Sequence, residues 1–387
     1  MALPIRYSWR NALIRWRSTI ATVGGIALVV FVFVLLQALA IGIEKSSGNT
    51  GDPRNLLVVR KGASAESASL ISREAVRAVQ YLEEIARTER DEPLISADVH
   101  VLVSLPRRDG SGEANVLLRG ITPRGMLLRP QVRLLAGRWF TPGKREVVVS
   151  ARLARRFANF ELGQSFRTGN ATLTVVGWLD GSNSAFDSEC WLDADECRSL
   201  FERDMYSSIL VRPVDAAASR RLTTRLEEDR RFKLKVEPET EYYRKQTMTA
   251  APIKWLGRFL AVMMSIGAVF AAMNTMYASV GARTREIGTL RVLGFRRRAV
   301  VLALLLEGGL LALSGGLLGC AVGMFWNGYS TATMGFETFS EIVFQFTITP
   351  QLVGQGLIFA LLVGLVGTLL PAIRASRLPV ITALKAI

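Results

Sequence analysis

The sequence predicts an α-helical membrane protein with four transmembrane helices and a large α+β extracytoplasmic domain between helices 1 and 2. Three observations lead to this fold class. Four long runs of the 387-residue chain are almost free of charge, basic residues concentrate in three short segments, and about 210 residues between the first two runs alternate strand-like and helix-like patterns.

The uncharged runs are each long enough to cross a bilayer. Residues 18–43 carry no formal charge, and neither do residues 259–281 and 350–373, while residues 299–326 carry only Glu307. A helix of about 20 apolar residues crosses the hydrocarbon core. A soluble helix of this length would show a polar face, and these runs show none. We therefore expect spans at residues 18–43, 255–281, 299–326 and 350–373.

The first run also resembles a signal peptide, because four arginines precede it and residues 38–40 (Ala-Leu-Ala) imitate a cleavage site. Its 26 uncharged residues exceed the apolar core of 7–15 residues that a signal peptide has. An uncleaved anchor is the favoured interpretation.

Basic residues predict the orientation of the spans. Residues 1–17, 282–298 and 374–387 together hold 13 basic side chains and one acidic one, whereas the other 339 residues hold 35 and 32. Such an excess marks cytoplasmic segments. We expect both termini and the 282–298 segment in the cytoplasm, and residues 44–254 and 327–349 outside it. The formal charge of +15 is thus a topology signal, which argues against nucleic acid as a partner.

Residues 44–254 alternate between strand and helix patterns without an internal repeat. We expect strands at residues 55–60, 97–105, 115–119, 146–150 and 171–179, helices at 73–88, 151–160 and 215–231, and a hairpin tip at 106–112. Tyr242, Tyr243 and Trp255 lie near the second span. They either anchor the chain at the membrane interface or pack against the domain.

No catalytic motif or metal-binding motif is present in the sequence. It has no phosphate-binding G-x-x-x-x-G-K-[ST] loop, no G-x-S-x-G and no H-E-x-x-H. The single histidine, His100, lies in an alternating strand pattern, which favours a structural role. Cys190 and Cys197 lie in the exterior segment, either as a disulfide or as two free buried thiols. We expect no catalytic residue and no metal site.

Polar and small residues inside the spans predict helix packing. Gly315, Gly319 and Gly323 recur every four residues, which lets helices approach closely, either within one subunit or between two. Glu307 is costly in lipid unless it is paired, and an arginine of the 282–298 loop is a possible partner. Asn274 is a candidate for a hydrogen bond between helices.

The cytoplasmic segment RTREIGTLRVLGFRRR (283–298) is more ordered than a loop that only marks topology. Ile287, Leu290 and Leu293 approximate an apolar stripe, and Gly294 fits the position after a helix end. The pattern predicts a short helix at the cytoplasmic surface. A segment that only bound lipid would need the arginines alone.

This segment, Glu307 and the glycine ladder resemble the permease domain shared by FtsX, the lipoprotein-releasing permeases and the MacB-type and DevC-type exporters. The closing stretch LPAIRASRLPVITALKAI (370–387) is similar to the end of that domain. LLAGRWFTPGKREVVVSARLARR (134–156) and LGQSFRTGNATLTVVGWL (162–179) resemble the MacB-like periplasmic core domain.

The resemblance implies a multi-pass inner-membrane permease of DevC-like size that contains no ATPase. Its partners would be a separate ABC ATPase that binds ATP and magnesium, a second permease copy (identical or not), membrane lipid, a periplasmic adaptor and an outer-membrane channel. Residues implied to couple the chain to the ATPase are Arg285, Glu286, Ile287, Gly288, Leu290, Arg291 and Gly294. ATP binding would then move the exterior domains, a process called mechanotransmission.

Export or efflux in a tripartite assembly is the expected function. Extraction of lipoprotein or lipid, and regulation of a cell-wall hydrolase as FtsX-type proteins do, are the alternatives. No residue pattern indicates the substrate.

Overall fold

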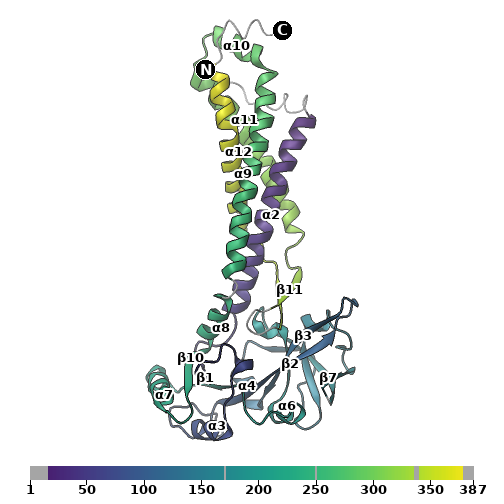
Figure 1. Cartoon of the computed structure of the whole chain (residues 1–387), viewed down its shortest axis with the longest axis vertical. Coiled ribbons are helices and arrows are strands. Elements are labelled where there is room, and N and C mark those ends of the chain that lie inside the picture. Colours follow the sequence, from purple (N-terminus) through teal and green to yellow (C-terminus); the bar gives the residue numbers. More distant parts are fainter. Residues whose placement is uncertain (1–15, 170, 249–250, 335–339, 378–387) are drawn as a thin grey trace. The chain divides into compact units, whose positions relative to one another are not determined.

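The computed structural model describes residues 16–169, 171–248, 251–334 and 340–377, and divides the chain into two compact units (Figure 1). The helical unit combines residues 1–41, 252–329 and 346–387. The exterior unit combines residues 42–251 and 330–345. Most of the predicted N-terminal segment (1–17) and of the C-terminal tail (374–387) lies outside the described residues.

The elements of the helical unit are α2 (Trp16–Gly48, whose last turns belong to the exterior unit), α9 (Ala251–Gly281), α10 (Thr284–Val292), α11 (Arg297–Met324) and α12 (Pro350–Ser376). The exterior unit contains the strands β1 (Leu56–Arg60), β2 (Ile95–Pro106), β3 (Glu113–Ile121), β4 (Arg133–Gly137), β5 (Glu146–Ser150), β6 (Ser165–Thr168), β7 (Ala171–Asp180), β8 (Glu189–Asp193), β9 (Ser208–Val211), β10 (Leu234–Pro238), β11 (Ser330–Met334) and β12 (Glu341–Gln345). Its helices are α3 (Arg73–Gln80), α4 (Pro123–Leu127), α5 (Ala151–Ala154), α6 (Ala194–Leu200), α7 (Ala216–Glu228) and α8 (Glu239–Met248), with short 3₁₀ turns η1 (Glu66–Ala68) and η2 (Ala185–Ser188).

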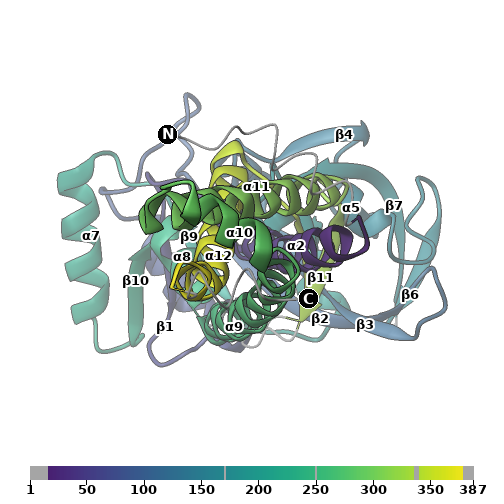
Figure 2. The same cartoon turned by 90° about the horizontal axis from the view of Figure 1, so that it is seen from above.

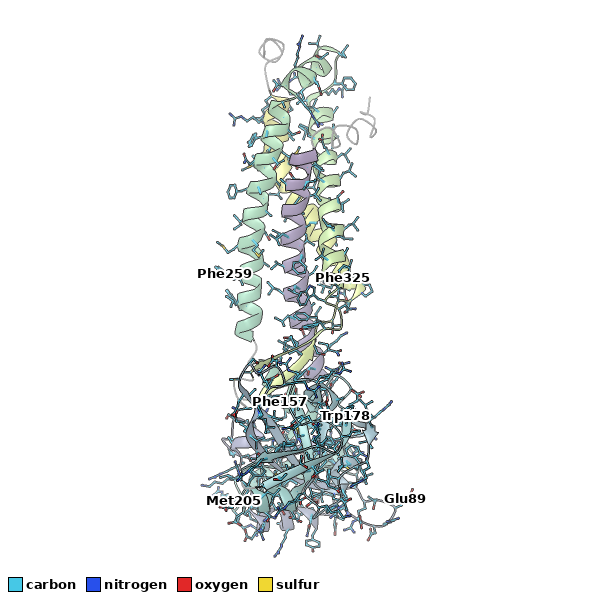
Figure 3. The ribbon with its side chains drawn as sticks, turned by 90° about the vertical axis from the view of Figure 1, so that its right-hand side faces the viewer. Glu89, Phe157, Trp178, Met205, Phe259 and Phe325 are labelled. Atoms are coloured by element: carbon cyan, nitrogen blue, oxygen red, sulfur yellow. The ribbon has the colours of Figure 1, made fainter. Side chains whose placement is uncertain are left out.

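Four helices are long and apolar enough to cross a membrane, at Thr19–Ser46, Trp255–Gly281, Arg297–Met324 and Pro350–Ser376. Together with the mixed α/β exterior unit they confirm the predicted fold class. Figure 2 shows α2, α9, α11 and α12 grouped in one bundle. Outward-facing side chains such as Phe259 and Phe325 are 52% and 88% exposed and project away from the helices (Figure 3). An apolar outer surface of this kind suits lipid as the solvent.

The exterior unit is built on one ten-stranded mixed sheet. Its strand order is β10-β1-β9-β2-β3-β8-β5-β7-β4, and β6 pairs with β7 outside this path. The long β2–β3 hairpin turns at residues 106–112, as predicted, and closes with a hydrogen bond from the Arg107 amide to the Gly112 carbonyl at 2.9 Å. Strands β3 and β8 are parallel, and so are β5 and β7, so the chain crosses over between the two members of each pair.

Two predicted helices of the exterior unit are too long. The helix expected at residues 73–88 ends at Gln80, because Ile85 leaves the helical path to bridge Pro213. The helix expected at residues 151–160 ends at Ala154. There the chain turns so that Phe157 bridges Arg107, and Asn159 takes a left-handed φ of 61°. In both cases contacts with segments distant in the sequence override a helical sequence pattern.

Residues 330–334 and 341–345 form strands of the exterior unit, where the sequence suggested only a loop. Strands β11 and β12 pair with each other in an antiparallel hairpin. Val343 of β12 is completely buried in the core that β2, β3, β5 and β7 share. The backbone amide of Val343 also donates a hydrogen bond of 2.8 Å to Ser188 Oγ. The link between α11 and α12 is therefore packed into the exterior unit.

Candidate functional site

The short helix α10 (Thr284–Val292) follows α9 and precedes α11. Leu293 caps its C-terminus, and Gly294 adopts a φ of +93° immediately afterwards. Only glycine reaches that conformation without strain, which explains the glycine at this position. The predicted helix at residues 284–294 is therefore present.

One face of α10 packs against the bundle. Ile287 is 6% exposed and joins buried residues of α9, α11 and α12, and Gly288 is buried beside it. Arg291 Nη1 donates to the Ser376 carbonyl at the end of α12 at 2.7 Å. These contacts hold the helix against the ends of its neighbours.

The opposite face of α10 is open. Arg285, Glu286, Val292 and Leu293 are exposed, as is Gly294. The side chain of Leu290 lies outside the described residues. Six of the seven residues predicted to couple to an ATPase thus fall into two groups: Ile287, Gly288 and Arg291 hold the helix, and Arg285, Glu286 and Gly294 face outward. Their coupling role itself stays a prediction.

Glu307 has the partner expected for a carboxylate within an apolar helix. Arg283 Nη1 donates to Glu307 Oε2 at 2.8 Å, and the two residues are only 8% and 9% exposed. Arg283 immediately precedes α10, so the ion pair fixes the start of this helix to α11. A buried charge with a paired, hydrogen-bonded partner avoids most of the cost of an isolated one.

The glycine ladder of α11 packs against α2 of the same chain. A Cβ at Gly315 would lie 2.9 Å from the Val23 carbonyl oxygen, and one at Gly319 would lie 2.5 Å from that of Ala27. Gly323 faces the Val34 side chain, whose Cγ1 would lie 3.3 Å from an added Cβ. Of the two predicted roles, the structure shows packing within one subunit.

Asn274 does not join helices of the described chain. Its side chain is exposed on α9, on the opposite side from Ala272 and Met276, which are buried. Within the described residues this side chain therefore makes no hydrogen bond to another helix, and its interhelical role stays a prediction. The helical periodicity of α9 places Asn274 on its exposed face. The sequence alone could not show this, because both faces of α9 are apolar.

Comparison with known families decides the identity of the chain. The model of the MacB-like periplasmic core domain matches residues 19–229, and that of the FtsX-like permease C-terminal domain matches residues 258–380. The first match alone covers more than half of the 387 residues.

The chain belongs to the MacB/FtsX-type permease family.

Curated relatives of this permease are ABC transporter proteins. It is 24% identical to the macrolide export ATP-binding/permease protein MacB of Bdellovibrio bacteriovorus over 93% of this chain and 57% of the relative. It is 32% identical to an uncharacterized ABC transporter permease, YknZ of Bacillus subtilis, over 36% of this chain and 32% of the relative. The pyoverdine export protein PvdT of Pseudomonas putida is 29% identical over 58% of this chain and 35% of the relative. The permease thus matches about half or less of the length of these proteins.

Solved structures similar to the permease are exterior domains. The extracellular domain of the ABC-type transporter YknZ from Gram-positive bacteria has a TM-score of 0.36 and 17% identity, and covers 47% of this chain and 99% of that one. The periplasmic region of MacB from Actinobacillus actinomycetemcomitans has a TM-score of 0.39 and 16% identity, and covers 51% of this chain and 94% of that one.

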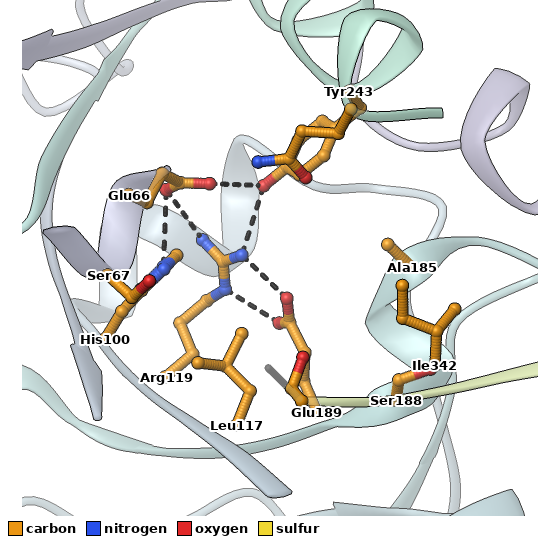
Figure 4. Close-up of a pocket in the computed structure, with 12 residues that line it drawn as sticks. Glu66, Ser67, His100, Leu117, Arg119, Ala185, Ser188, Glu189, Tyr243 and Ile342 are labelled. Atoms are coloured by element: carbon orange, nitrogen blue, oxygen red, sulfur yellow. Dashed lines mark hydrogen bonds and ion pairs between the residues drawn. The ribbon is translucent and has the colours of Figure 1, made fainter. Parts of the chain in front are cut away.

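The exterior unit of the permease contains a buried charge cluster that sequence patterns did not reveal (Figure 4). Arg119 of β3 is 1% exposed and binds Glu189 of β8 through two hydrogen bonds of 2.7 Å. The same guanidinium donates to Asp98 at 3.2 Å, to Glu66 at 3.4 Å and to Tyr243 Oη at 3.1 Å. One cation thus ties β2, β3, β8, η1 and α8 together.

Strand register explains why these groups meet. Asp98 and His100 are two residues apart on β2 and so share one face of the sheet. His100 lies directly opposite Arg119 in the β2–β3 pairing, which brings both side chains to that face. Arg129, which is completely buried, adds a second guanidinium by donating to Asp98 at 2.6 Å.

Burial sets the protonation of the neutral groups in this cluster. Desolvation, followed by repulsion from Arg119, lowers the pKa of His100 well below 6.5, so the imidazole is neutral at pH 7. Desolvation likewise raises the pKa of Tyr243 well above 10, so its hydroxyl stays protonated and donates to Glu66 Oε1 at 2.9 Å. Tyr242 and Tyr243 both pack in the exterior core. Of the two predicted roles, membrane anchor and domain packing, these two tyrosines therefore have the second.

A second set of charges holds the β11–β12 hairpin. Glu341 is 5% exposed, and its two carboxylate oxygens accept hydrogen bonds of 2.6 Å from Arg107 Nη2 and Arg156 Nε. Arg107 lies at the β2–β3 turn and Arg156 just after α5. Charge-assisted hydrogen bonds of this length are among the stronger polar contacts in proteins.

The possible disulfide is not formed. All three cysteines, which lie within the described residues, are free buried thiols. Cys190 of β8 and Cys197 of α6 each pack as small apolar side chains in the main exterior core. Burial raises the pKa of Cys197 to about 12, which keeps this thiol protonated and unreactive at neutral pH.

Proposed function

We propose that this permease is the membrane subunit of an ABC exporter and takes its energy from a separate ATPase that binds ATP and magnesium. The exposed face of α10 is the docking surface in this proposal. In this proposal both termini and α10 lie on the cytoplasmic side of a bacterial inner membrane, and the sheet domain lies on the other side. The positive charge of residues 1–17, 282–298 and 374–387 supports this orientation.

The observation that carries the proposal is the two-sided environment of α10. Ile287 is fixed in a core formed by α9, α11 and α12, whereas Glu286 and Leu293 face away from it. Arg283 and Arg291 tie the two ends of α10 to α11 and α12. A force on the exposed face would therefore reach three membrane helices without bending a loop. This is the arrangement that a lever requires.

Energy would leave the bundle by mechanotransmission to the exterior domain. The β11–β12 hairpin links α11 and α12 covalently to that domain, and Glu341 fixes the hairpin with two arginines. Motion of these helices would be transmitted through the hairpin as well as through α2 and α8. The substrate would then be moved by the exterior domains and would not need a charged path through the helices.

Further partners follow from this role. A second permease copy would complete the transporter, and a periplasmic adaptor with an outer-membrane channel would complete a tripartite exporter. The names of the MacB and PvdT relatives, which describe export, favour this function over the two alternatives. Those alternatives are extraction of lipoprotein or lipid, and regulation of a cell-wall hydrolase.

Co-purification tests the proposal. The tagged permease should retain its ATPase through purification in mild detergent, and Glu286→Lys should release it, because the substitution reverses a charge on the exposed face of α10. Glu113→Lys reverses an exposed carboxylate at the β2–β3 tip and is the matched control that should retain the ATPase. Recovery of no ATPase with the wild type, or equal recovery with both variants, would refute docking at α10.

The partner that co-purifies from outside the membrane separates the three functions. An adaptor protein supports export, a lipoprotein carrier supports extraction, and a cell-wall hydrolase supports regulation.

A further inference from the structure

A cavity of about 60 Å³ adjoins the buried charge cluster of the exterior unit (Figure 4). Its walls come from the turns η1 and η2, from strands β2, β3 and β8, from α8 and from the β11–β12 hairpin. The lining residues used below are Glu66, His100, Glu189, Tyr243, Ala185 and Ile342. One water molecule needs roughly 10–15 Å³ of such space, so the cavity has room for about four waters or one small ligand group.

His100 carries an unsatisfied polar atom at this cavity. The residue is 3% exposed, and its Nε2 makes no hydrogen bond within the described structure. Nε2 lies 3.3 Å from Glu66 Oε2, which is close enough for electrostatic contact, but the angles do not suit a hydrogen bond. Buried polar atoms nearly always have a partner, so an open one beside a cavity indicates a ligand or water.

The charge around the cavity is unbalanced toward the negative. Two buried carboxylates, Glu66 and Glu189, line the cavity together with one buried guanidinium group, Arg119. The neutral imidazole adds no positive charge. Excess negative charge in a desolvated site is unfavourable, and a bound cation would offset it.

The chemistry of the acceptors selects the kind of cation. In the tautomer that carries its proton on Nδ1, the Nε2 of a neutral imidazole has a lone pair and, next to a carboxylate, accepts N–H donors. A primary ammonium offers three such donors in a compact head group. The apolar side chain of Ile342 suits the first carbon of an alkylamine.

We propose that this cavity binds a primary ammonium group, with His100 Nε2 and the Glu66 carboxylate as its acceptors. The occupant contacts α8 through Tyr243 and the β11–β12 hairpin through Ile342, so it bridges two elements that lead to membrane helices. The ammonium group belongs either to a free small amine or to the end of a longer alkyl chain. The proposal is independent of the ATPase partner, because binding requires only the exterior unit.

The chain offers a direct reporter for this site, because His100 is its only histidine. Full-length permease labelled with ¹⁵N- and ¹³C-histidine, purified in detergent without ATPase or nucleotide, should give one imidazole signal. Methylammonium chloride is added at constant ionic strength and at a pH ~1 unit above the usual histidine pKa. It should shift the imidazole signal, and the shift should saturate as the amine concentration rises. Butylammonium should act equally if the site takes the end of a chain, and only methylammonium should act if it encloses a free amine.

Matched additives and variants make the test decisive. Methanol, which has a similar size but no charge, and sodium chloride should leave the imidazole signal in place. Glu66→Gln should weaken binding about tenfold or more, since a charge-assisted hydrogen bond is lost. Ala185→Leu keeps every charge and fills the cavity, so it should abolish the shift while the thermal unfolding transition remains cooperative.

Three outcomes would overturn the proposal. The first is an equal shift with methanol or sodium chloride, which would indicate a medium effect. The second is absence of a saturable shift with either amine. The third is unchanged amine binding in folded Ala185→Leu, which would place the amine outside this cavity.

Discussion

Adding one methyl group at Gly319 should destabilise the helix bundle, and adding one at Gly309 should stabilise it. Both glycines lie on α11 and both are buried. A Cβ at Gly319 meets the Ala27 carbonyl oxygen at 2.5 Å, whereas a Cβ at Gly309 meets the end of the Leu361 side chain at an ordinary 3.5 Å. The two positions therefore differ only in what the new methyl group contacts.

The two substitutions should change the free energy of unfolding in opposite directions. Replacing a helical glycine by alanine stabilises a helix by about 0.5–1 kcal/mol when the methyl group has room. Overpacking costs about 1–3 kcal/mol, and at Gly319 the obstructing atom is backbone oxygen, which cannot move aside by changing a rotamer. Gly309→Ala should therefore gain about 0.5–1 kcal/mol and Gly319→Ala should lose about 1–2 kcal/mol.

The free energy of unfolding, measured by titrating the detergent-purified chain with denaturing detergent and following tryptophan fluorescence, checks the difference. Gly315→Ala should fall near Gly319→Ala, because its new Cβ meets backbone oxygen at 2.9 Å, and Gly323→Ala should cost less, because its nearest atom is a side-chain carbon at 3.3 Å. Equal stability of Gly319→Ala and Gly309→Ala would refute the packing of α11 on α2 described above.

Three further predictions concern charged groups. Glu307→Gln should cost about 1–3 kcal/mol of unfolding free energy by leaving Arg283 buried without a counter-charge, and adding Arg283→Gln should recover part of it in a double-mutant cycle. Glu341→Gln should raise hydrogen exchange in residues 341–345 while exchange in the β2–β3 hairpin stays constant; equal exchange would argue against the arginine clamp. The hydrogen bond from Arg138 holds the pKa of Glu146 at about 2 instead of 4.5, so the stability it contributes is present above pH 4.5 and lost as the pH falls toward 2. A pH titration followed by fluorescence should show a smaller loss over this range for Glu146→Gln than for the wild type.

The membrane architecture could be predicted because its signal is local. Runs of more than 20 residues without charge have few structural solutions, and the partner of Glu307 followed from the cost of a lone carboxylate in lipid. The turn at Gly294 was also readable from residue type, because the left-handed conformation favours glycine. Each of these inferences depends on one short segment.

The buried charge cluster could not be predicted because its members are far apart in the sequence. Glu66 and Tyr243 share a hydrogen bond across 177 positions. Charged residues on strands are usually exposed, so Arg119 gave no sign of being buried. The one available signal was Asp98 and His100 on the same face of a largely apolar strand, which indicates a polar site inside the sheet. Likewise, nothing local could show that Val343 belongs to a core built mostly from residues 99–197.

The packing of the β11–β12 hairpin into the exterior unit means that the chain passes between the two units four times, after residues 41, 251, 329 and 345. A soluble fragment cut at the ends of the long insertion, residues 44–254, would lose Val343 from its core and leave Arg107 and Arg156 without their shared carboxylate. A stable excised domain should therefore carry residues 330–345 on a linker. Exchanging exterior domains between relatives should likewise require that the hairpin be exchanged with them.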